Sequence, residues 1–212
     1  DGIYHTVVSR DIVKRHRINK QDLFDRVVKY LMENMGKTFS ASSITKFLRN
    51  EHRTVSVESI YNYLRWLEQA FIIYPCERYD LQGKEILKVQ EKFYLADTSL
   101  RYSVLGYSPD SIASSLENII YLELKRRGYI VYVGKTGNAE IDFVAQRQND
   151  KLYVQVTQEI NSEKTEKREY ERLLEIRDNY PKYVLRTDEF ASGNYEGIKT
   201  MHIADFLLSN EY

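Results

Sequence analysis

The order of secondary structure expected between residues 112 and 157 constrains this chain more than any other feature. Apolar residues recur at helical spacing through residues 112–127, and Gly128 is a typical stop signal after such a helix. Three segments with the two-residue alternation of half-buried strands follow, at 129–133, 140–146 and 151–157. The sequence therefore predicts one helix followed by three strands, the last two of which could pair as a hairpin.

Three polar residues lie where this pattern predicts burial. Glu117 shares a helical stripe with the apolar residues Tyr121 and Leu124. Asp142 and Gln155 lie within the second and third strands. A buried carboxylate needs a partner, because removing a bare charge from water is costly. Glu117, Asp142 and Gln155 could together supply the oxygen ligands that Mg²⁺ or Mn²⁺ prefers, and such an ion could activate a water for attack on a phosphodiester.

Two of the acidic residues also have a structural interpretation. Glu117 could be a buried carboxylate that pairs with Lys125 or Arg101. Asp97 follows a short expected strand and could be read as a ligand, but its position favours an N-cap of the next helix.

Residues 19–90 have the order of a winged helix, which is three short helices followed by a hairpin. The helices are expected at about 19–35, after Ser40 and at 56–70, and the extended segments at 71–78 and 84–89. The third helix would present Tyr61, Asn62 and Arg65 as candidate DNA contacts. Alternatively, this unit packs only against protein or acts as a lid, because a fold alone does not fix a function.

Tyr107-Ser-Pro109 interrupts the pattern and separates two expected domains of an α/β protein. The expected boundaries are a tail of an upstream module at 1–18, the winged helix at 19–106 and the second domain at 107–212. The second domain is expected to continue beyond residue 157 with a helix at 162–178, strands at 182–186 and 198–202, and a helix at 203–208.

The second domain resembles the PD-(D/E)XK, or restriction-endonuclease-like, superfamily. Its members place a helix with Glu, then Asp, then Glu/Gln-X-Lys on an αβββαβ core, and residues 112–186 are similar to that core. This resemblance implies that Glu117, Asp142, Gln155 and Thr157 occupy the catalytic positions, with Mg²⁺ or Mn²⁺ as the cofactor.

The resemblance to one prokaryotic family covers most of the chain. Residues 93–101, 116–129 and 140–145 resemble the C-terminal domain of AAA-type ATPases whose function is uncharacterised. Residues 6–15 resemble the end of the ATPase module, and residues 19–90 resemble the winged helix behind it. The upstream ATPase module and DNA are the partners that this resemblance implies, and a second copy of the chain is a further candidate. No Gly-x-x-x-x-Gly-Lys-Ser/Thr motif occurs, so ATP binding is expected only in a full-length protein.

One position departs from the nuclease pattern. The superfamily has a lysine two residues after the Glu/Gln, and here that position is Thr157. Gln155 is neutral and therefore a weaker metal ligand than glutamate. We expect a DNA-associated or assembly module with a degenerate nuclease-like site, and the alternative is a Mg²⁺- or Mn²⁺-dependent endonuclease that uses Glu117, Asp142 and Gln155.

Composition adds weak constraints on partners and location. Lys plus Arg and Asp plus Glu both number 31, but residues 1–92 carry 16 basic and 12 acidic residues, which favours nucleic-acid contact in that half alone. The single cysteine and the lack of an apolar run of membrane-spanning length are typical of a cytoplasmic protein. The chain begins in mid-pattern, so we expect a fragment of a longer protein.

Overall fold

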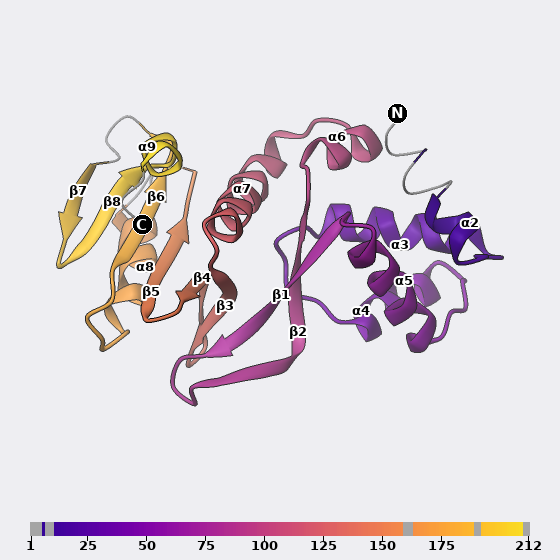
Figure 1. Ribbon diagram of the computed structural model, residues 1–212, viewed down its shortest axis with the longest axis horizontal. Coiled ribbons are helices and arrows are strands. Elements are labelled where there is room, and N and C mark those ends of the chain that lie inside the picture. Colours follow the sequence, from indigo (N-terminus) through magenta and orange to yellow (C-terminus); the bar gives the residue numbers. More distant parts are fainter. Residues whose placement is uncertain (1–5, 7–10, 159–162, 189–191, 210–212) are drawn as a thin grey trace. The chain divides into compact units, whose positions relative to one another are not determined.

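The computed structural model describes residues 6, 11–158, 163–188 and 192–209 (Figure 1). The chain divides into two compact units. The first is formed by Asp1–Pro75 with Val89–Pro109, and the second by Cys76–Lys88 with Asp110–Tyr212. Most of the tail expected at 1–18 lies outside the described residues. No helix in the described part of the chain combines the length and hydrophobicity needed to cross a membrane.

The first unit is mainly helical. Its helices are α2 (Val13–Arg15), α3 (Gln21–Glu33), α4 (Ala41–Asn50), α5 (Val57–Gln69) and α6 (Ser99–Leu105). Ser40 and Ser56 cap α4 and α5, because each hydroxyl accepts a hydrogen bond from the N–H of the serine three residues later, at 3.2 and 3.1 Å. The apolar faces of α3, α4 and α5 meet in one core that includes Phe24, Ile44 and Leu67.

The side chain of Asp97 caps the start of α6, as predicted, although Thr98 is the residue at the N-cap position. Its Oδ1 accepts a hydrogen bond from the N–H of Ser99 at 2.7 Å. Arg101, on the same helix, donates from Nε to the carbonyl of Met32 at 3.1 Å. That bond fastens α6 to the end of α3 within the first unit.

The second unit carries most of a mixed sheet. Its elements after the hairpin of β1 (Ile73–Asp80) and β2 (Glu85–Leu95) are α7 (Ile112–Arg126), β3 (Ile130–Thr136), β4 (Ala139–Arg147), β5 (Asp150–Val156), α8 (Glu163–Leu174), β6 (Lys182–Arg186), β7 (Ser192–Tyr195), β8 (Ile198–His202) and α9 (Ile203–Leu208). Across the described residues the strands form one eight-stranded sheet in the order β2-β1-β3-β4-β5-β6-β8-β7. Strand β3 pairs with β4 and β4 with β5 in antiparallel fashion, whereas β6 is parallel to both β5 and β8. The chain is therefore a mixed α/β protein.

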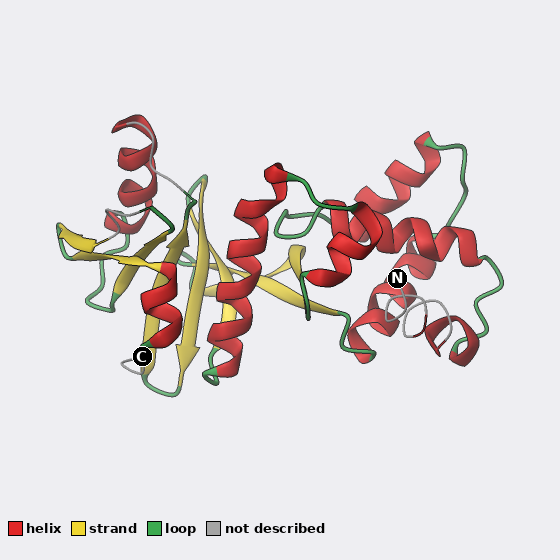
Figure 2. Ribbon diagram, turned by 90° about the horizontal axis from the view of Figure 1, so that it is seen from above, coloured by secondary structure: helices red, strands yellow, loops and turns green. Residues whose placement is uncertain are grey.

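Helices cover both faces of this sheet (Figure 2). The ring of Phe143 on β4 lies 6.1 Å from that of Tyr121 on α7, measured between centroids. The next residue, Val144, packs instead with Tyr170 and Leu173 of α8. Because neighbouring residues of a strand point to opposite faces, α7 and α8 cover opposite faces of the sheet. Helix α9 joins α7 on its face, since Arg127, directly after α7, lies over the ring of Phe206 on α9.

Candidate functional site

Asp142 and Gln155 meet where the ladder between β4 and β5 ends. The regular register of these strands ends at Phe143 opposite Val154. One residue further, the Oε1 of Gln155 accepts a hydrogen bond from the N–H of Asp142 at 3.3 Å. The Oδ2 of Asp142 in turn accepts one from the N–H of Val156 at 2.8 Å. Two buried polar side chains thus take over hydrogen bonds that main-chain carbonyls would otherwise make.

A β-bulge in β4 sets the position of Asp142. On the β3 side the register shifts between the pairs Tyr132–Val144 and Gly134–Ile141, so β4 carries one extra residue there. Gly134 is needed opposite the bulge, because a Cβ at that residue would lie 2.8 Å from Cγ2 of Val144. Bulges redirect side chains, and here the bulge lies beside the Asp142 main chain that Gln155 contacts.

The faces of the sheet separate Gln155 from α7. Along β5, Gln155 lies two residues after Tyr153 and therefore on the same face, and its register partner on β6 is Val184. Tyr153 and Val184 both belong to the core under α8. Strand alternation therefore places the side chain of Gln155 on the α8 side.

Glu117 and Thr157 complete the set of residues predicted for this site. Glu117 is half-buried on α7, one helical turn before Tyr121, whose side chain packs against the opposite face of the sheet from α8. Thr157 is half-buried and donates its N–H to the carbonyl of Leu185 at 2.9 Å, which extends the pairing of β5 with β6. The structure thus brings Asp142 and Gln155 together, whereas Glu117 belongs to the helix on the other face from Gln155.

The side-chain oxygens of Asp142 and Gln155 do not make a good ligand set for magnesium. Oxygens of Asp142 and Gln155 already accept main-chain N–H groups, and Gln155 brings no charge. No group of three or more His, Cys, Asp or Glu side chains that could hold a metal ion occurs within the described residues. The chemistry that these contacts support is hydrogen bonding at a strand end.

The exposed face of α5 carries the residues predicted to contact DNA. The side chain of Tyr61 is 61% exposed. Arg65 is exposed and donates from Nη2 to the Oδ1 of the half-buried Asn62 at 2.7 Å. This bond holds the guanidinium close to the helix surface, one turn from Tyr61.

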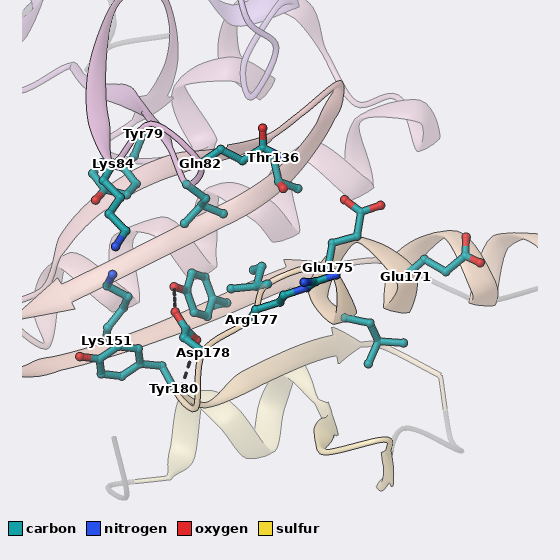
Figure 3. Close-up of a pocket in the computed structure, with 14 residues that line it drawn as sticks. Tyr79, Gln82, Lys84, Thr136, Lys151, Glu171, Glu175, Arg177, Asp178 and Tyr180 are labelled. Atoms are coloured by element: carbon teal, nitrogen blue, oxygen red, sulfur yellow. Dashed lines mark hydrogen bonds between the residues drawn. The ribbon is translucent and has the colours of Figure 1, made fainter.

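A large pocket lies on the α8 side of the sheet (Figure 3). It has a volume of about 1120 Å³ and is lined by the β1–β2 turn, β3, β5, α8 and the loop after α8. In its wall, the hydroxyl of Tyr153 donates to Oδ2 of Asp178 at 2.5 Å. Burial, and secondly this hydrogen bond, raise the pKa of Tyr153 far above its ordinary value of 10, so Tyr153 remains a neutral donor.

Sequence reasoning missed this pocket, because five separate segments build it. The loop after α8 is itself unexpected, since the helix ends at Leu174 and not at residue 178. The Oδ1 of Asp178 accepts the N–H of Tyr180 at 3.2 Å, and Pro181 follows. An Asp side chain bonded two residues ahead, before a proline, is turn chemistry that could have located the loop.

Comparison with known proteins identifies relatives of most of the chain. An uncharacterised protein of Haemophilus influenzae is 37% identical over 98% of this chain, and an uncharacterised protein of Methanocaldococcus jannaschii is 29% identical over 82%. The chain spans 51% and 39% of the lengths of these two proteins. No solved structure gives a significant match. Residues 1–111, just over half of the chain, match a domain of unknown function, DUF8612, and the chain therefore belongs to that family.

Proposed function

We propose that this chain is a nucleic-acid-associated module that does not cleave its ligand, and that it forms the C-terminal part of a longer prokaryotic AAA-type ATPase. In this proposal residues 19–106 are a winged helix and residues 107–212 are a degenerate PD-(D/E)XK-like domain. ATP would bind only to the upstream module of the full-length protein. The lengths of the two relatives, which are about twice that of this chain or more, are consistent with a further module.

The order of elements supports the two assignments. Helices α3, α4 and α5 are followed by the hairpin of β1 and β2, which is the order of a winged helix. The run α7-β3-β4-β5-α8-β6 has the αβββαβ order of the nuclease-like core, with β3, β4 and β5 antiparallel and β6 parallel to β5.

Our main reason for proposing that the chain does not cleave nucleic acid is the pair of hydrogen bonds that links Asp142, Gln155 and Val156. One oxygen of each side chain, Oδ2 of Asp142 and Oε1 of Gln155, already accepts a main-chain N–H. Thr157 cannot replace the lysine of the nuclease pattern, because a hydroxyl carries no positive charge to stabilise a developing phosphorane. The site therefore lacks both a strong ligand set and its cationic helper.

The surface of α5 supports contact with nucleic acid. Tyr61 offers an exposed ring, and Arg65 offers a guanidinium for a phosphate or a base edge. Residues 1–92 carry four more basic than acidic residues, since 16 minus 12 is 4. This excess would give a modest, salt-dependent attraction for a polyanion.

Binding of a fluorescent DNA duplex tests the proposal. We expect fluorescence anisotropy to show binding that weakens as salt rises from about 50 to about 200 mM, because phosphate contacts release counterions. Arg65→Ala should weaken binding and lower the slope of log K against log salt by about 1. The matched control is Arg126→Ala, which removes another exposed arginine bonded to a residue three positions earlier on a helix. No binding at low salt, or equal losses in both variants, would contradict this function and favour a protein-facing assembly domain.

A further inference from the structure

The pocket on the α8 side has a cationic end formed by Lys84 and Lys151. Their ammonium groups point toward each other across the pocket (Figure 3). Among the described residues, neither ammonium makes an ion pair with an acidic side chain. Two like charges that face each other repel, and an anion between them would relieve this repulsion.

The ammonium of Lys151 is positioned without being neutralised, and the main chain leading to Lys84 is fixed by a turn. The Nζ of Lys151 lies 5.9 Å from the ring centroid of Tyr79 and 5.3 Å from that of Tyr180. Cation–π contacts position the ammonium but leave its charge available to a ligand. Lys84 follows a turn in which Oδ1 of Asp80 accepts the N–H groups of Gln82 and Gly83, at 3.0 and 3.3 Å.

The other end of the pocket carries two glutamates and one arginine, Arg177. Glu171 and Glu175 lie on α8 and directly after it, and Figure 3 shows them at the side away from the two lysines. The third acid, Asp178, lies near the lysines, but its charge is offset by Lys182, whose Nζ is 3.6 Å from Oδ1. The pocket therefore presents two lysines at one end, and the Glu171 and Glu175 carboxylates together with the Arg177 guanidinium at the other.

We propose that this pocket binds a nucleoside phosphate. The phosphate lies between Lys84 and Lys151, and the base contacts the ring of Tyr79 or Tyr180. Hydroxyl or amino groups of the ligand donate to the carboxylate of Glu175. The volume of about 1120 Å³ is ample for a nucleotide, since ligand pockets commonly enclose about 300–1,000 Å³. None of the lining residues belongs to the sets predicted for catalysis or DNA contact, so this proposal does not depend on the function proposed above.

Isothermal titration calorimetry of the chain with AMP, ribose 5-phosphate and adenosine tests the site. We expect AMP to bind, ribose 5-phosphate to bind more weakly and adenosine not to bind. Lys84→Gln and Lys151→Gln should each weaken AMP binding about tenfold, because each removes one of the two charges that contact the phosphate. Tyr180→Ala should weaken the binding of AMP but not that of ribose 5-phosphate.

The control is Lys125→Gln, which removes an exposed lysine on α7, outside the pocket. It should leave the AMP affinity unchanged, and thermal unfolding should confirm that all variants fold. The proposal is wrong if AMP does not bind, if both pocket variants bind AMP like the unmodified chain, or if Lys125→Gln weakens binding as much as they do.

Discussion

Replacing Arg127 by methionine is expected to lower the free energy of unfolding by about 3–5 kcal/mol, because it breaks a buried charged network. The side chain of Arg127 is only 6% exposed. Its Nε donates to Oε1 of Glu123 at 2.7 Å, and its Nη2 donates to the carbonyl of Phe206 at 2.8 Å. The guanidinium also lies 4.8 Å from the ring centroid of Phe206. Methionine fills similar space but removes the donor to the Phe206 carbonyl and leaves Glu123 with only the exposed Arg126 as a charged partner, which would loosen α9 from the end of α7.

Arg126→Met is the matched control for this prediction. Arg126 contacts the same carboxylate at 2.7 Å, but its side chain is 68% exposed. Its loss should cost less than about 1 kcal/mol, as for other surface ion pairs. Urea unfolding of the three proteins at pH 7 measures the difference, and equal losses in the two variants would show that burial of Arg127 is not what makes its contacts strong.

Acid unfolding gives a second readout of the same network. The hydrogen bond from Arg126, followed by that from Arg127, lowers the pKa of Glu123 from its ordinary value of 4.5, against the opposing effect of burial. A carboxyl whose pKa is lower in the folded state stabilises the fold above its unfolded pKa, and this contribution is lost as the pH falls through the folded pKa. The loss of stability between pH 5 and pH 3 should therefore be smaller in Arg126→Met than in the unmodified chain.

Much of the fold could be predicted, because the spacing of hydrophobic residues indicates the type of each major helix and strand. Strand β6, strand β8 and helix α9 have the predicted bounds, and α7 ends one residue before the predicted limit. Strand β7 was missed, because Ser192-Gly-Asn-Tyr195 is an exposed edge strand with no buried face to leave an apolar alternation. Residues Cys76–Lys88, which are most of β1 and the start of β2, group with the second unit and not with the domain expected at 19–106, and the N–H of Leu81 bonds the carbonyl of Lys135 there at 2.9 Å. A pairing between segments this distant leaves no local pattern.

Local alternation along the strands also allowed part of the candidate site to be predicted. The expected proximity of Asp142 and Gln155 is confirmed, because both lie on neighbouring strands of a hairpin whose register the alternation fixes. The hydrogen bonds from the main chain of Asp142 to Gln155, and from the main chain of Val156 to Asp142, could not be predicted. The bulge at Asp142 depends on packing around Gly134, where a single extra residue changes the direction of the strand. The roles of Glu117 and Thr157 in catalysis remain predictions.

Two substitutions of Asp142 separate a structural role from a catalytic one. Asp142→Ala should lower the free energy of unfolding by about 1–3 kcal/mol, because the N–H of Val156 loses its acceptor at a partly buried position. Asp142→Asn should cost much less, since the amide oxygen can accept the same hydrogen bond. A metal ligand would behave differently, because asparagine preserves the shape of the residue but removes the charge that holds a divalent cation.

Incubation with plasmid and Mn²⁺ completes this comparison. If the hydrogen bonds of Asp142 and Gln155 are structural, the unmodified chain and Asp142→Asn should both leave the plasmid intact, and only Asp142→Ala should unfold at lower urea concentration. Cleavage by the unmodified chain that is lost in the equally stable Asp142→Asn would instead establish a metal-dependent nuclease. Equal cleavage by all three proteins would indicate contamination. Because stability and cleavage respond to different properties of the side chain, the main-chain contacts of Asp142 and its charge can be judged independently.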